Sequence, residues 1–179
     1  AIKEDDPHHP ITRTLALENT VLGQVQDPGH HRLLAEAVRE QGLSVHLDGA
    51  RIFDAAAAAG LPVTAFTEGI DAIMFCLSKG LSCPAGAIIA GKREFIDRAR
   101  LVRKRVGGAM RQAGVLAACG IVALETMVER LAEDHAHART LAAGIQDIPG
   151  LSVEIEYVET NMVYVDHTAS GLSTEEVLS

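Results

Sequence analysis

The sequence predicts an α/β fold: a mostly parallel sheet flanked by helices, followed by the start of a smaller α+β domain. Over the first hundred residues, short apolar runs alternate with segments of helical spacing. Two of these runs, 72–77 and 85–90, are apolar at nearly every position, which is typical of strands buried on both faces. After residue 105 helix-forming residues dominate as far as Pro149, where a turn is predicted and short runs return.

Composition supports a globular protein. The chain has 179 residues, of which 47% are hydrophobic and 22% are charged, and it has no Trp. The core must therefore be built mainly from Ala, Leu, Val and Ile. The net charge is −8, with no basic stripe, which argues against binding to nucleic acid or to an anionic membrane surface. No run approaches the ~18 apolar residues that would span a bilayer.

Cysteine spacing gives no sign of a metal site. Cys76, Cys83 and Cys119 are widely separated, and neither a CxxC pair nor a Cys/His metal spacing occurs. We therefore predict no bound metal, and three reduced thiols in a cytoplasmic protein.

The first part of the chain is expected to contain four strands and three helices. Gly42, and later Gly60 with Pro62, stand where helix ends are expected. The expected strands are 14–17, 43–47, 72–77 and 85–90, and the expected helices are 33–41, 52–59 and 92–105.

The second part is expected to begin with two helices between 110 and 148. Strands of a second sheet are predicted at 151–155 and 162–165, and Ser173 is expected to open a helix. The predicted division is a large α/β domain over 1–105, a helical connection over 106–148, and the start of a small α+β domain over 149–179. Because neither end of the chain completes an element, we expect an internal piece of a longer protein.

Two charged side chains follow predicted strands. Asp48 ends one strand and Lys79 follows another, and ligands of open α/β sheets bind at the carboxyl ends of strands. A lysine amine can form a Schiff base, and a carboxylate can pair with a pyridinium nitrogen. The alternative is structural: Asp48 would cap the next helix at Ala50, and Lys79 would be a surface lysine in a turn.

Five blocks of the sequence closely resemble the low-specificity L-threonine aldolases, which are pyridoxal-phosphate enzymes of fold type I, the aspartate aminotransferase fold. They occur in the same order and at similar spacing, and together they cover nearly the whole chain. The blocks are LALENT (15–20), HLDGARIF (46–53), FCLSKGLSCPAG (75–86), GGAMRQAGVLAACGI (107–121) and TNMVYV (160–165).

The resemblance implies roles for five residues. Lys79 would bond covalently to pyridoxal 5'-phosphate, and Asp48 would pair with its ring nitrogen. Arg51 would hold the substrate carboxylate or the cofactor, with a salt bridge on its own helix as the alternative. Ser78 would orient the lysine or donate to the cofactor, unless it only forms the turn. Arg111 would lie near the cofactor or its phosphate, or else have a structural role at a helix N-terminus.

The activity implied is retro-aldol cleavage of L-threonine, L-allo-threonine and related β-hydroxy-α-amino acids to glycine and an aldehyde. The partners implied are this amino-acid substrate and further copies of the chain, as a homodimer or homotetramer at full length. The phosphate-binding loop, the ring-stacking histidine and a carboxylate-binding arginine would lie outside this chain. The isolated chain is therefore expected to bind the cofactor weakly or not at all, and to be inactive by itself.

The sequence departs from the family pattern after LENT. Val21 stands where the resembling enzymes usually have a histidine, and valine cannot accept a proton. This departure leaves another activity of the same cofactor class open, namely β-elimination, racemisation or transamination, and it also leaves open an inactive, truncated paralogue. Glu18 and Asn19 are expected near the site, whereas His135 and His137 are expected to be solvated on a polar helix.

Overall fold

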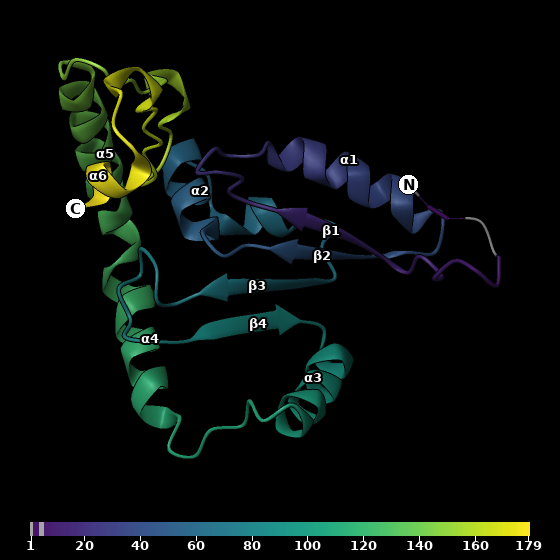
Figure 1. Cartoon of the computed structure of the whole chain (residues 1–179). Helices are drawn as coiled ribbons and strands as arrows, with labels where there is room; N and C mark the ends of the chain where they lie inside the picture. The colour runs from purple at the N-terminus through teal and green to yellow at the C-terminus, as the bar shows by residue number, and fades with distance from the viewer. Residues whose placement is uncertain (1, 4–5) are drawn as a thin grey trace.

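The computed structural model describes residues 2–3 and 6–179. A single mixed sheet organises the first half of the chain (Figure 1). Its strands, in spatial order, are β1 (Thr14–Glu18), β2 (Ser44–Asp48), β3 (Ala72–Cys76) and β4 (Ala87–Gly91). The first three are mutually parallel and β4 is antiparallel to β3, so the predicted fold class is confirmed.

The direction of β4 follows from the short connection before it. A parallel neighbour needs a crossover of a dozen or more residues, usually with a helix, and residues 77–86 are too few for one. Instead, the backbone N–H of Leu77 donates to the carbonyl of Gly86 at 2.9 Å, which continues the antiparallel pairing beyond β3.

Helices follow β1, β2 and β4 along the chain. α1 begins five residues earlier than predicted, because Asp27 caps it by accepting from the N–H of Gly29 at 2.9 Å, and Pro28 fits the first turn. The helical elements of this half are α1 (Pro28–Arg39), α2 (Ile52–Ala59), η1 (Val63–Thr67) and α3 (Arg93–Arg105).

The largest core cluster lies where α2 and η1 pack on β2 and β3. Leu47, Ile52 and Phe66 are at most 1% exposed, and Ala55 and Ala56 are buried among them. Alanines on the buried face of α2 let this helix approach the sheet closely, as expected for a core with few aromatic residues.

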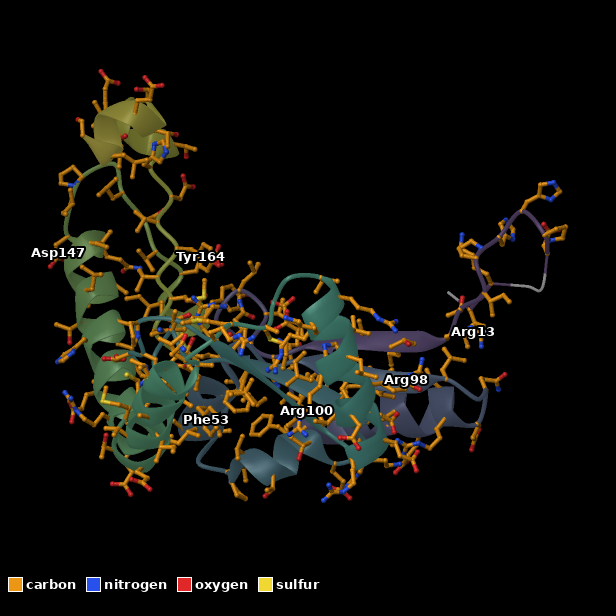
Figure 2. The ribbon with its side chains drawn as sticks, turned by 90° about the horizontal axis from the view of Figure 1, so that it is seen from below. Arg13, Phe53, Arg98, Arg100, Asp147 and Tyr164 are labelled. Carbon is orange, nitrogen blue, oxygen red and sulfur yellow. The ribbon has the colours of Figure 1, made fainter. Side chains whose placement is uncertain are left out.

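Two long helices follow, α4 (Gly114–Thr126) and α5 (Leu131–Gln146), joined by the short turn η2 (Val128–Arg130). Figure 1 shows them one above the other beside the edge at which β1, β2 and β3 end. In the view of Figure 2, the end of α5 near Asp147 and the segment containing Tyr164 project together from one end of the molecule, and Arg13 lies toward the other end.

The predicted strands at 151–155 and 162–165 are wrong. Only an isolated bridge between Ser152 and Asp166 forms there, and the chain is otherwise irregular apart from η3 (Ile155–Tyr157) and η4 (Thr168–Ser170). The apolar side chains of this segment pack on α5 instead of forming a ladder, since Val153 and Val158 join Ala138 and Ala142 in one cluster. The apolar pattern thus reflected burial against a helix.

The last predicted helix is confirmed as α6 (Thr174–Leu178). Ser173 and Glu176 form a reciprocal capping box at its start. The proposed division of the chain near residues 105 and 149 stays a prediction. Within the described residues, no helix is both long enough and apolar enough to cross a membrane.

Candidate functional site

The ends of β2 and β3 are tied together at the carboxyl edge of the sheet. The N–H of Gly49 donates to the carbonyl of Met74 at 2.9 Å. A Cβ at Gly49 would lie 2.8 Å from Cδ1 of Ile73 and 3.0 Å from the Met74 carbonyl oxygen, so only glycine fits this close approach. Asp48, the last residue of β2, is therefore held beside the end of β3.

Asp48 itself is exposed at this edge. Its Oδ1 accepts a hydrogen bond from the N–H of Ala50 at 3.0 Å, so the capping interaction considered from the sequence is present. Its Oδ2 has no hydrogen-bond partner among the described residues. One carboxylate oxygen is thus used by the fold, and the other can accept from a ligand.

Lys79 lies in a compact turn over residues 77–83, called the lysine turn below. The N–H of Ser82 donates to the Lys79 carbonyl at 2.8 Å, and the N–H of Cys83 donates to the Leu77 carbonyl at 3.0 Å. Leu77, Leu81 and Cys83 are buried, whereas Ser78 and Lys79 are exposed. The apolar residues anchor the turn and leave the amine and the hydroxyl accessible.

Arg51 follows Asp48 by three residues and directly precedes α2. Its side chain is half-buried, and its Nε is buried without a hydrogen-bond partner in the described part of the chain. Buried polar atoms in native proteins nearly always have partners. A guanidinium donor without a partner, three residues after Asp48, is suited to an anionic group of a ligand.

Arg111 is not brought to this group. It is exposed in the connection between α3 and α4, and no hydrogen bond or ion pair joins it to Asp48, Arg51 or Lys79 within the described residues. Figure 1 shows this connection running below β4, on the far side of the sheet from β1. A cofactor role for Arg111 stays a prediction.

In the loop after β1, the polar side chain of Asn19 stabilises the loop and is not exposed to a ligand. Asn19 is 1% exposed, and its side chain donates to the carbonyl of Gln26 and accepts from the N–H of the same residue, which closes the loop. Val21 pairs through its backbone with Gln24 at the loop's tip. Glu18 is exposed at the end of β1, next to Asp48 in the register.

A buried pair behind the lysine turn was missed by the sequence reading. His135, expected to be solvated, is 3% exposed, and its Nε2 lies 3.3 Å from Oδ1 of Asp54 on α2. Burial raises the pKa of the Asp54 carboxyl, and the contact with His135 partly opposes that rise. The signal that could have revealed it is the helical spacing of the buried face of α5: Leu131, His135, Ala138 and Ala142.

Among the described residues, no group of three or more His, Cys, Asp or Glu side chains could hold a metal ion. Cys76, Cys83 and Cys119 are free thiols.

Comparison with known protein families gives a match over residues 1–168 to the family described as beta-eliminating lyase. Among curated relatives, the chain is 44% identical over 164 residues to a probable low-specificity L-threonine aldolase 2 of Arabidopsis thaliana, covering 90% of this chain and 46% of that protein. It is 42% identical over 164 residues to the low specificity L-threonine aldolase of Escherichia coli strain K12, covering 92% of this chain and 48% of that protein. The chain thus spans about half the length of the relatives it matches.

Solved structures agree on the fold. A putative aromatic amino acid beta-eliminating lyase/threonine aldolase from Exiguobacterium matches with a TM-score of 0.73 at 26% identity, covering 86% of this chain and 44% of that one. A putative L-allo-threonine aldolase from Listeria monocytogenes matches with a TM-score of 0.74 at 24% identity, covering 88% and 45% respectively. The latter likeness concerns the fold alone.

Proposed function

Since the chain belongs to the beta-eliminating lyase family, we propose that the whole protein is a pyridoxal-phosphate-dependent lyase. It cleaves L-threonine, L-allo-threonine and related β-hydroxy-α-amino acids to glycine and an aldehyde. The observation that carries the proposal is the placement of Lys79 and Asp48 at the carboxyl ends of two adjacent strands, each with a group left for a ligand. The names of the curated relatives support the choice of substrate.

The residues at this edge fit pyridoxal phosphate by their chemistry. An exposed lysine amine, a carboxylate with one unbonded oxygen and a guanidinium with a buried, unpaired Nε are the groups that the aldehyde, the ring nitrogen and an anion would need. When bound, this cofactor acts as an electron sink for the charge left on Cα as a bond to that carbon breaks.

Each side chain then has a distinct task. Lys79 would bond to the cofactor aldehyde and would be released as a free amine when the substrate amine takes its place. Asp48 would keep a proton on the ring nitrogen through Oδ2, while its Oδ1 stays fixed by the N–H of Ala50. Arg51 offers planar, bidentate recognition of the substrate carboxylate. Ser78, exposed next to the lysine, hydrogen-bonds to the cofactor, and Arg111 is assigned to its phosphate region.

We propose self-association as a homodimer or homotetramer for the whole protein. The structural support is an apolar surface on α4, where Val115, Ile121, Val122 and Leu124 are each 40% or more exposed. Such exposed apolar side chains are suited to burial against a second subunit.

The first test is chemical trapping of the lysine. The chain contains four lysines, Lys3, Lys79, Lys92 and Lys104, so three of them serve as internal controls. The purified chain is mixed with pyridoxal phosphate, reduced with borohydride and mapped by peptide mass spectrometry. Borohydride reduction makes the bond permanent, so it detects even the weak complex expected of a chain that spans about half the length of its relatives.

Preferential labelling of Lys79 over Lys92, whose side chain is 85% exposed, is the expected result. Labelling of Lys79 at or below the rate of Lys92 would contradict the proposal. An Asp48→Asn variant should reduce the preference for Lys79, because the amide no longer favours a protonated ring.

A second candidate activity, β-elimination, is favoured by Val21, which offers no side-chain base near a substrate hydroxyl. Product analysis of the whole protein separates the two. Retro-aldol cleavage releases glycine and acetaldehyde from threonine in equal amounts, whereas β-elimination releases pyruvate and ammonia from serine.

A further inference from the structure

We propose that Asp54 and His135 are positioning residues that hold the lysine turn, and with it Lys79, against the carboxyl edge of the sheet. The inference builds on the proposed function, in which Lys79 is the reactive lysine. Neither residue was identified from the sequence, and neither is exposed to a ligand.

The pair joins two elements that belong to different parts of the chain. Asp54 lies on α2, one turn after Arg51, and His135 lies on α5. Their side chains are each 4% exposed, and Oδ1 of Asp54 lies 3.3 Å from Nε2 of His135. The contact therefore fixes the helix that follows Asp48 and Arg51 against the helix that borders the carboxyl edge.

The lysine turn lies directly on this contact. A Cβ at Gly80, the residue after Lys79, would lie 3.3 Å from both carboxylate oxygens of Asp54 and 2.6 Å from Cδ2 of Leu131. Leu131 is one turn before His135 on α5 and is 1% exposed. The backbone next to Lys79 is thus confined between a carboxylate from α2 and an apolar side chain from α5.

The charges around Asp54 indicate a directional role more than a stabilising one. His135 and Asp134 of α5 act on its charge, as does Arg51, which directly precedes α2. A buried ion pair often contributes no more to stability than apolar residues of similar volume, because desolvation offsets the attraction. A hydrogen-bonded pair does, however, fix one relative geometry, and this is the property that a reactive lysine requires.

The test compares three variants of the chain. Asp54→Leu/His135→Leu replaces the polar pair by an apolar one and removes the directional contact. His135→Gln keeps a nitrogen donor near the Asp54 carboxylate and is the conservative variant. Ala138→Gly, one turn along α5, weakens the same helix without touching the lysine turn, and is the matched control for a loss of stability.

Two readouts are measured on each variant. The first is hydrogen exchange of the Ser82 and Cys83 amides, whose hydrogen bonds close the lysine turn. The second is the rate of borohydride trapping at Lys79 relative to Lys92. In the double leucine variant we expect exchange to be about tenfold faster and relative trapping about tenfold slower, because misplacement of about 1 Å can change a rate by more than this. His135→Gln and Ala138→Gly should leave both readouts within about twofold.

Unchanged exchange and unchanged relative trapping in the double variant would overturn the inference. If that variant does not fold, His135→Ala replaces it in both measurements. If Lys79 is not trapped in the unmodified chain, trapping is repeated on the whole protein, where absence of labelling at Lys79 would refute the proposed function. The exchange readout alone still decides whether the pair holds the turn.

Discussion

Gly80→Ala is a direct test of how closely the lysine turn is packed. The added methyl would lie 2.6 Å from Cδ2 of Leu131, closer than carbon atoms approach without displacement. Gly80 is not among the residues with positive φ, so alanine is compatible with its backbone and the effect is steric.

The loss of unfolding free energy depends on whether the side chains around the added methyl can move away. Leu131 is 1% exposed, so its methyl group cannot swing into solvent, and on the other side the methyl meets both oxygens of Asp54 at 3.3 Å. Overpacking of this kind costs about 1–3 kcal/mol of unfolding free energy. With an m-value of about 2 kcal/mol/M, the urea midpoint should fall by about 0.5–1.5 M.

The assay is urea unfolding followed by circular dichroism, with Gly144→Ala as the control. Gly144 lies inside α5, and a Cβ there would meet no atom within 4 Å. This control should raise the unfolding free energy by up to about 1 kcal/mol through helix propensity alone.

A Gly80→Ala midpoint at or above that of the unmodified chain would refute the packing argument. A double-mutant cycle identifies the cause. In a Leu131→Ala background the obstructing methyl is gone, so Gly80→Ala should cost less than about 0.5 kcal/mol there, and the two changes should be non-additive.

Two further predictions concern buried polar groups. Thr160→Val should lower the unfolding free energy by about 1–2 kcal/mol in urea unfolding, because the fully buried Thr160 hydroxyl donates to the carbonyl of Gly23 at 2.6 Å. The exposed Thr140 hydroxyl bonds only within its own helix, so Thr140→Val should change the unfolding free energy little. Equal losses of unfolding free energy in the two variants would contradict this. Burial raises the pKa of Asp54 above 3.8, so its protonated form stabilises the fold in acid, and this contribution is lost as pH rises through the folded-state pKa. The urea midpoint of Asp54→Asn should therefore rise relative to that of the unmodified chain as pH increases. A difference between the two midpoints that does not change with pH would contradict this prediction.

The strands of this sheet could be predicted because each is a compact apolar run bounded by turn residues. Their directions could be predicted only in part. The run 85–90 reads as a parallel strand buried on both faces, yet β4 is antiparallel, and Ile88 and Ile89 are 39% and 52% exposed. Hydrophobicity reports the surface that a strand can bury, whereas its direction depends on the length of the connection before it.

The exposed half of the candidate site could also be predicted. Asp48 ends one strand and Lys79 follows another, and strand ends can be located in a sequence. Because β2 and β3 pair in parallel, both residues lie at the same edge of the sheet. The buried half could not. Asp54 and His135 are 81 residues apart, and only the docking of α5 onto α2 brings them together.

The surroundings of Lys79 therefore depend on helices far along the chain. Gly80 is confined by Leu131 of α5, and a Cβ at Gly120 of α4 would lie 3.0 Å from Cδ1 of Leu77, where the lysine turn begins. The sheet supplies the edge and Asp48, but its backbone pairing ends before Lys79. Since α4 and α5 provide the contacts on both ends of the turn, the docking of residues 114–146 determines where the amine of Lys79 points. Changes at the residues of these helices that contact the lysine turn, such as Leu131, should thus alter the reactivity of a lysine that they do not cover.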